Sequence, residues 1–321
     1  MKTSVVGSFP LSHSVENLRV ALEDQLRAGI DYPSSPQLQD MNLMFLKPLA
    51  EQGCGIEIIE NEAWLKSDLI PPKSPVAIED LEWTLRFLQH ENAHRKFVGV
   101  KMPITGPITL SSTTKILKDT YAVNYPDLIL RFADVVSEIV KQSCEHGVKM
   151  ISIDEPCIPF ALWLGISEDV IIEAVNKSIG KAENCITALH VCGELKGISR
   201  ILLKTDAKIL NHEFKAIPKN LDEYKKTDLE KHDKLIGLGC VQTKPYSEGK
   251  IPIESPQEIE QFILKAGEKL GLEHLMIFPD CGFGGLKELY PTEKEAQDIA
   301  YKKMANMVQA ARKIRKEKLM R

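Results

Sequence analysis

The stretch Cys185-Ile-Thr-Ala-Leu-His190-Val-Cys192-Gly193 is an apolar, strand-like run that ends in polar side chains and a glycine. Successive residues of a strand point to opposite faces, so His190 and Cys192 project to the same side. The same pattern returns at Val148–Ile153, which is followed directly by Asp154 and Glu155. Each run of this kind predicts a strand with candidate functional groups at its carboxyl end.

Similar apolar, often β-branched runs recur along the chain, and stretches with helical periodicity separate them. The predicted strands are Thr3–Phe9, Gly55–Ile59, Lys96–Ile104, Val148–Ile153, Cys185–Val191, Ala207–Phe214, Lys234–Val241 and His274–Phe278. Helix starts are marked by Ser167 before two acids and by a capping box of Ser255 and Glu258.

Eight strands that alternate with helices predict an α/β fold, a single (β/α)8 TIM barrel that spans residues 1–321 as one domain. A doubly wound open sheet is the alternative. It is disfavoured because no early strand is followed by the glycine-rich turn of dinucleotide-binding folds. Val6-Gly7-Ser8 lacks the second and third glycines of that turn.

The composition narrows the class of protein. Hydrophobic residues make up 43% of the chain and charged residues 27%, and the net charge of −4 provides no basic field for nucleic acid. No apolar segment approaches the roughly 20 residues of a membrane span. Seven irregularly spaced cysteines indicate reduced thiols rather than a disulfide framework. We therefore expect a cytoplasmic protein with no nucleic-acid or membrane partner.

If the chain forms a barrel, several side chains that can bind a metal lie together on the face formed by the carboxyl ends of the strands. Active sites of such barrels lie on that face. His190 and Cys192 would there meet Cys281, which follows the last predicted strand. An imidazole with two thiolates favours zinc. Glu213 could complete a tetrahedral site. The adjacent His212 is a rival ligand, because strand alternation puts only one of the two in the lumen.

Other predicted strand ends carry candidate substrate-binding groups. Asp154 and Glu155 could bind a substrate ammonium or act as a base, and a helix cap or a rim acid is the alternative. Ser8 lies in a strand end marked by glycine and proline, which suits backbone N–H groups aimed at a carboxylate. Glu60 and Glu62 follow the second predicted strand and are further candidates for substrate binding.

Taken in order, these motifs resemble the catalytic C-terminal barrel of the cobalamin-independent methionine synthase family over nearly the whole chain. They are Val6-Gly-Ser-Phe-Pro10, Thr105-Gly-Pro-Ile-Thr109, Ile153-Asp-Glu-Pro156, His190-Val-Cys-Gly193, Glu213 and Pro279-Asp-Cys-Gly282. The resemblance implies a methyltransferase of methionine biosynthesis that methylates the thiol of homocysteine, with a zinc-bound thiolate as the nucleophile. It implies a Zn2+ site made of His190, Cys192, Glu213 and Cys281, with Asp154 on the amino group of homocysteine and Ser8 near its carboxylate.

The chain differs from the family's pattern at residues near the methyl donor. A tryptophan that follows the family's Gly-Pro-x-Thr motif, near the folate, is replaced here by Leu110-Ser-Ser-Thr-Thr114. Glu60 and Glu62 are only rough substitutes for the family's acid after strand two. The chain is similar to short core forms of the enzyme, so the expected donor is either a corrinoid protein or a methyl-folate. A thiol-alkyltransferase for a coenzyme M-type thiol and a non-catalytic, zinc-stabilised barrel are the alternative functions.

Overall fold

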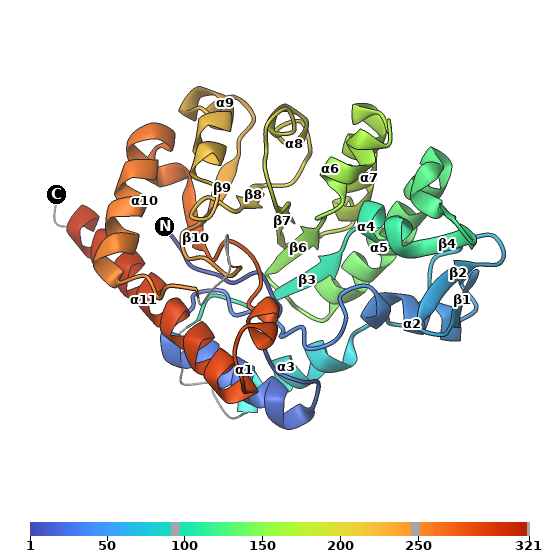
Figure 1. The fold of residues 1–321 in the computed structure, drawn as a ribbon, viewed down its shortest axis with the longest axis horizontal. Coiled ribbons are helices and arrows are strands. Elements are labelled where there is room, and N and C mark those ends of the chain that lie inside the picture. The colour runs from blue at the N-terminus through green and yellow to red at the C-terminus, as the bar shows by residue number, and fades with distance from the viewer. Residues whose placement is uncertain (91–96, 245–250, 320–321) are drawn as a thin grey trace.

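The centre of the molecule is a parallel sheet of six strands, seen in a computed structural model that describes residues 1–90, 97–244 and 251–319 (Figure 1). Its strands run in the order β10-β9-β8-β7-β6-β3. Their bounds are β3 Lys101–Thr105, β6 Met150–Asp154, β7 Ile186–His190, β8 Ile209–His212, β9 Leu235–Gly239 and β10 Leu275–Phe278. Four lie inside the predicted apolar runs, whereas β3 and β6 extend one residue beyond theirs, to Thr105 and Asp154. Lys96 of the third run lies outside the described residues.

Two short segments close this sheet into a ring. Thr3 forms a parallel bridge with Ile277 of β10, and Ser4 forms one with Tyr32. Ser34 then bridges to Lys101 of β3. Six strands and two bridged segments thus occupy the eight positions of a (β/α)8 barrel, and the predicted fold class is confirmed.

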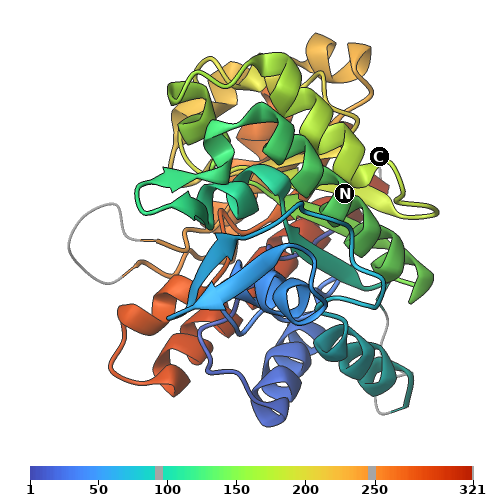
Figure 2. The ribbon, with the colours of Figure 1, turned by 90° about the vertical axis from the view of Figure 1, so that its right-hand side faces the viewer.

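The second barrel position is a correction to the sequence analysis. The segment around Tyr32–Ser34 occupies it, whereas the predicted strand Gly55–Ile59 lies outside the ring. Its residues form β1 (Ile56–Ile59), which pairs in antiparallel fashion with β2 (Glu62–Leu65). These two strands join β4 (Thr114–Leu117) and β5 (Thr120–Tyr121) in a small sheet, which faces the viewer in Figure 2.

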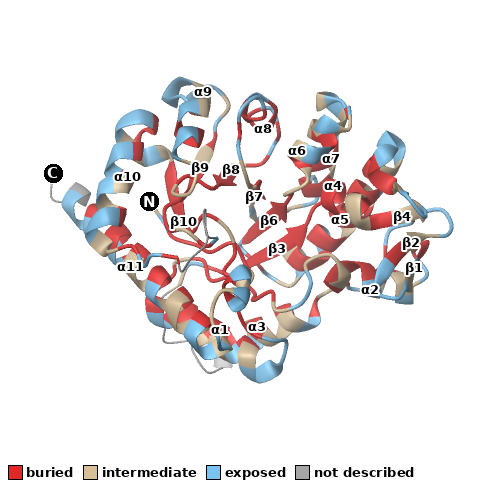
Figure 3. Ribbon diagram, in the orientation of Figure 1, coloured by how far each residue is buried: buried red, intermediate tan, exposed pale blue. Residues whose placement is uncertain are grey.

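Helices surround the ring and cover its strands, so the strands are buried and the outer helix faces are exposed (Figure 3). The bounds of the helices before β6 are α1 Val15–Ala28, α2 Leu43–Glu51, α3 Glu79–His90, α4 Pro107–Thr113, η1 Ala122–Asn124 and α5 Pro126–Glu145. Those after β6 are α6 Ile158–Trp163, α7 Glu168–Ile179, α8 Ser199–Leu202, η2 Pro218–Glu223, α9 Lys226–Lys231, α10 Pro256–Leu270, η3 Leu272–His274, η4 Gly284–Glu288 and α11 Glu293–Leu319.

The predicted helix starts are confirmed. The Ser167 side chain accepts a hydrogen bond from the backbone N–H of Val170 at the start of α7. Ser255 and Glu258 form the reciprocal capping box of α10. Among the described residues, no helix combines the length and the apolar character needed to cross a membrane.

A lysine is buried inside the barrel where β3 meets the first bridged segment. Lys101 is 1% exposed, and its ammonium donates hydrogen bonds to the carbonyl oxygens of Val5 and Val6. Burial lowers the pKa of Lys101 to about 8, and the nearby Asp154 carboxylate only partly opposes that shift. Lys101 therefore holds the backbone immediately before Gly7 and Ser8 against β3.

The lowered pKa of Lys101 predicts a pH-dependent stability. Between pH 8 and the ordinary lysine value, the unfolded chain binds a proton that the folded chain has lost, so folding becomes more favourable as pH rises. The stability of the wild type relative to Lys101→Met should rise by about 1 kcal/mol per pH unit above pH 8 and stay constant below it. Urea unfolding of both proteins from pH 7 to pH 10 measures this difference, and a flat difference would show that Lys101 titrates normally.

Candidate metal centre

Neighbouring strands place three polar side chains in one row at the barrel mouth. Asp154 of β6 is the register partner of His190 of β7, and His190 is the partner of Asn211 of β8. All three are nearly fully buried. The parallel register thus sets an acid, an imidazole and an amide side by side at the carboxyl ends of the strands.

His190, Cys192 and Cys281 form a cluster whose ligand atoms all lie within 4.8 Å of one another. His190 Nε2 lies 3.1 Å from Cys192 Sγ, and the Sγ atoms of Cys192 and Cys281 are 3.3 Å apart. The cluster is formed by the end of β7 and the turn after β10, as the sequence analysis predicted. One imidazole nitrogen and two sulfurs at this spacing fit a tetrahedral zinc ion.

Asn211 fixes the orientation of the His190 ring, a role that the sequence analysis missed. Its Nδ2 donates to the Gly237 carbonyl oxygen over 2.8 Å, so its Oδ1 faces the ring as an acceptor. His190 Nδ1 lies 2.8 Å from that Oδ1 and must carry the proton, which leaves Nε2 free as a ligand. The only sequence signal for this contact is that Asn211 is a polar residue within the predicted strand Ala207–Phe214.

Glu213 lies beside the cluster but outside the group of three converging ligand residues, and His212 is directed elsewhere. Glu213 Oε2 accepts a 2.8 Å hydrogen bond from the backbone N–H of Gly193, next to Cys192. His212 instead contacts the Val191 carbonyl oxygen and the Tyr224 hydroxyl, and burial lowers its pKa to about 3. Strand alternation therefore separates the two rivals as predicted, with Glu213 on the side of the mouth.

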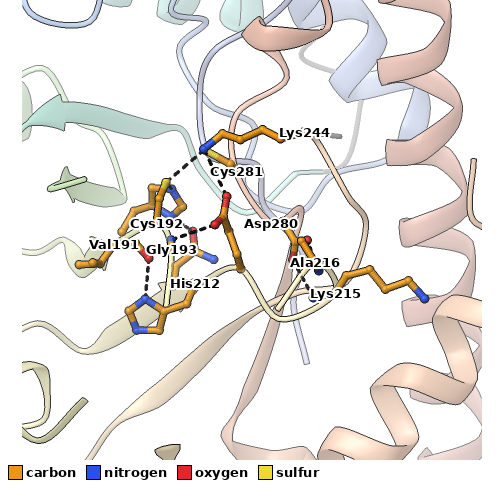
Figure 4. Close-up of polar contacts among 12 residues, drawn as sticks. Val191, Cys192, Gly193, His212, Lys215, Ala216, Lys244, Asp280 and Cys281 are labelled. Atoms are coloured by element: carbon orange, nitrogen blue, oxygen red, sulfur yellow. Dashed lines mark hydrogen bonds and ion pairs between the residues drawn. The ribbon is translucent and has the colours of Figure 1, made fainter. Parts of the chain in front are cut away.

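Lys244 is a second residue that the sequence analysis missed. Its Nζ lies 3.3 Å from Glu213 Oε1, and Figure 4 shows it beside Cys192 and Cys281. A hydrogen bond from Cys192, with help from His190 and Lys244, lowers the pKa of Cys281 well below its ordinary value. The same sulfur–sulfur hydrogen bond, together with burial, raises the pKa of Cys192. Cys281 is therefore the more acidic thiol of the pair.

A cavity of about 460 Å³ opens beside the cluster. Cys192, Glu213 and Lys244 are among the residues that line it. The candidate ligands therefore border a space that can admit a small molecule, which is a property of catalytic rather than closed structural zinc sites.

Ser8 reaches the same region from the first bridged segment. Its carbonyl oxygen accepts a 2.8 Å hydrogen bond from Phe283 N–H, and its hydroxyl accepts one from Gly284 N–H. A Cβ on Gly282 would lie 2.0 Å from Ser8 Oγ, so only glycine allows this contact. The structure thus places Ser8 against the turn that carries Cys281.

The structure gives Glu155 the helix-capping role that was the alternative to catalysis. Its two carboxylate oxygens accept hydrogen bonds from the backbone N–H groups of Ile108 and Thr109 and from the Thr109 hydroxyl, at 2.6–2.9 Å. Glu155 is fully buried, and this burial raises its pKa to about 7. The carboxylate faces the start of α4, and we leave Glu155 out of the proposed chemistry.

Glu60 and Glu62 belong to the peripheral hairpin and not to the described His/Cys/Cys cluster. Both are exposed, and Glu60 has the left-handed backbone of a tight turn. Glu62 pairs with Lys115 of β4 at 2.6 Å. Their displacement follows from the correction to the second barrel position, because the strand that they follow lies outside the ring.

Comparisons with known proteins find relatives that match nearly the whole chain. The family model described as "Cobalamin-independent synthase, Catalytic domain" matches residues 39–313. The chain is 29% identical to a methionine synthase of Methanothermobacter marburgensis, with 97% of this chain and 99% of that protein covered. It is 28% identical to a methionine synthase of Methanocaldococcus jannaschii, with 98% and 100% covered.

Solved structures show the same fold. A B12-independent methionine synthase from Shewanella sp. W3-18-1, in complex with selenomethionine, superposes with a TM-score of 0.71 at 19% identity and covers 100% of this chain and 99% of that chain. A protein from Listeria monocytogenes described as a putative vitamin-B12 independent methionine synthase has a TM-score of 0.67 at 16% identity, with 95% and 97% covered.

The contact between Asn211 and His190 predicts a metal-affinity defect without loss of a ligand. Asn211→Ala should weaken zinc binding about 10- to 100-fold, because the imidazole loses the partner that fixes its orientation and tautomer. Asn176→Ala is the matched control, since Asn176 Oδ1 accepts a backbone hydrogen bond from Asp206, on the helix side of the barrel. Zinc competition with a chelating dye measures both affinities, and equal affinities in the two variants would contradict the orienting role.

Proposed function

Because the chain belongs to the cobalamin-independent methionine synthase family and is therefore a methyltransferase, we propose that it methylates the thiol of homocysteine at a zinc site formed by His190, Cys192 and Cys281. The observation that carries this proposal is the convergence of the three ligand atoms within 4.8 Å at the barrel mouth. Glu213 is proposed as the fourth ligand, because its carboxylate is anchored to Gly193 beside Cys192.

The proposed set of metal ligands suits a metal ion that activates a thiol. When bound, zinc supplies a Lewis acid that keeps a thiol substrate ionised near neutral pH, and the thiolate is the nucleophilic form of a thiol. Two cysteines and a glutamate contribute three anionic side chains, and His190 presents its Nε2 as a ligand because its Nδ1–H faces Asn211 Oδ1. An electron-rich ligand set of this kind preserves the nucleophilicity of a substrate sulfur.

Asp154 is proposed to bind the amino group of homocysteine. Its carboxylate lies one strand from His190, and the Ser152 hydroxyl donates to its Oδ1 over 2.7 Å. Burial raises the pKa of Asp154, while Lys101 and His190 act in the opposite direction. A substrate ammonium would add another opposite charge and hold the carboxylate in its ionised form.

Ser8 is proposed to help hold the carboxylate of homocysteine from the other side of the cluster. The hydrogen bonds that join Ser8 to Phe283 and Gly284 keep it next to Cys281. With Asp154 and Ser8 on two sides of the cluster, the substrate sulfur is directed toward the ligands by its own amino-acid group. The methyl donor is proposed to be a methyl-folate or a methylated corrinoid, and parallel assays with each donor distinguish them.

The zinc site predicts a defined metal content. The purified protein should bind one zinc ion per chain, and Cys192→Ser with Cys281→Ser should abolish binding because both thiolates are lost. Metal analysis measures the content, and X-ray absorption at the zinc edge should show one additional sulfur ligand when homocysteine is added. That new sulfur would distinguish thiol activation from a purely structural zinc.

The matched control for this experiment is the double variant Cys144→Ser, Cys185→Ser. Those two sulfurs lie 3.0 Å apart but belong to no described metal-ligand group, so zinc content should not change. Full zinc occupancy in the Cys192/Cys281 double variant would refute the proposed site. An added sulfur with a coenzyme M-type thiol, and none with homocysteine, would refute the proposed acceptor.

The role of Asp154 predicts a defect in substrate binding. Asp154→Asn should raise the KM for homocysteine about 10- to 100-fold, because a charge-assisted hydrogen bond contributes about 1.5–3 kcal/mol. The acceptor 4-mercaptobutyrate has the same chain without the amino group and serves as the control substrate. Its KM should be similar for wild type and variant, and a parallel rise for both acceptors would rule out the contact with the amino group.

A further inference from the structure

We propose that Asp280 is a positioning residue of the metal site. It holds Glu213 in place by binding the backbone N–H groups of the three residues that follow Glu213. Asp280 Oδ1 accepts hydrogen bonds of 2.9 Å from the N–H groups of Phe214 and Lys215. Its Oδ2 accepts a 2.7 Å hydrogen bond from Ala216 N–H. Figure 4 shows this carboxylate at the loop that carries Lys215 and Ala216.

Three successive N–H groups that converge on one carboxylate form an anion-binding nest. The nest begins immediately after Glu213, and Asp280 immediately precedes Cys281. The contact therefore joins the segment of the proposed fourth ligand to the turn of the third. Because Asp280 is 1% exposed, solvent does not compete for these hydrogen bonds.

The surrounding residues hold Asp280 itself in a fixed position. Its backbone N–H donates to the Val241 carbonyl oxygen over 3.0 Å. A Cβ on Gly239 would lie 2.4 Å from Asp280 Oδ1, so the glycine at the end of β9 leaves the space that the carboxylate needs. The Glu213 carbonyl oxygen, in turn, accepts a hydrogen bond from Asn220 Nδ2 over 2.8 Å. Asn220 thus fixes the carbonyl oxygen of Glu213, and Asp280 fixes the N–H groups that follow it.

Asp280 acts through Glu213 and not as a ligand. Its two oxygens are directed at the three N–H groups of the loop, whereas Glu213 turns a carboxylate oxygen to Gly193 N–H, next to Cys192. This inference rests on the proposed zinc site. It adds that the position of the fourth ligand is set by a buried carboxylate in the turn after β10.

Asp280→Asn tests the inference, because the amide keeps the shape of the side chain but turns one acceptor into a donor that faces an N–H group. Its zinc affinity should fall about 10- to 100-fold, as for other residues that orient metal ligands. In a Glu213→Gln background the same substitution should have no further effect, because the residue through which Asp280 acts is already removed. A loss that persists in that background would overturn the positioning role.

Glu155→Gln is the matched control. Glu155 is an equally buried carboxylate with three hydrogen-bond donors, but these donors belong to the start of α4. Both variants should lose thermal stability, and only Asp280→Asn should lose zinc affinity. Equal zinc affinities for Asp280→Asn and wild type would overturn the inference and leave the zinc site intact, whereas a wild type without zinc would overturn the proposed function itself.

Hydrogen exchange keeps the inference testable if Asp280→Asn does not fold. In the metal-free wild type, the amides of Phe214, Lys215 and Ala216 should be protected, because their hydrogen bonds to Asp280 are buried. Exchange at the rate of an open loop would show that the nest does not exist before the metal binds, and would overturn the inference.

Discussion

The parallel register of β6, β7 and β8 is the constraint on which the site depends. It sets Asp154 beside His190 and His190 beside Asn211, at one height in the barrel mouth. A slip of one residue in any of these strands would turn its polar side chain to the helix layer and break up the row. The next partner in the row is Gly237, where a Cβ would lie 2.7 Å from the Cβ of Asn211. The row is thus specified by a small residue as well as by polar ones.

The sequence was sufficient for the ring of six paired strands and for the His/Cys/Cys cluster, and physical reasons explain where it failed. Periodicity detects a strand by its apolar side chains, and Ile56–Ile59 is apolar whether it lies in a barrel or in a peripheral hairpin. The segment that takes the second position, Tyr32-Pro33-Ser34, contains a proline and a serine and pairs only through isolated bridges. Its place is set by tertiary contacts, including the 2.8 Å hydrogen bond from Lys101 N–H to the Pro33 carbonyl oxygen.

The residues that support the ligands were harder to predict than the ligands. Cysteine and histidine at strand ends are distinctive residue types, whereas Asn211, Lys244 and Asp280 are ordinary polar residues until their partners are known. Asp280 and Glu155 illustrate the difficulty, because both are buried carboxylates with three N–H or O–H donors and a pKa raised to about 7 by burial. One lies against the ligand loop and the other against a helix start. Only the partner distinguishes a positioning role from a capping role.

The charged side chains at the mouth lie around one ammonium group, and the apolar core of the barrel is separate from the two cysteines beside it. Lys244 Nζ lies 3.3 Å from Glu213 Oε1, and the hydrogen bond between the two sulfurs lowers the pKa of Cys281 and raises the pKa of Cys192. Bound as proposed, zinc would require Cys192 as a thiolate, so the metal affinity would be linked to pH. The buried core extends around the whole ring and does not include the ligands Cys192 and Cys281. Substitution of either cysteine therefore removes no part of the core that stabilises the barrel.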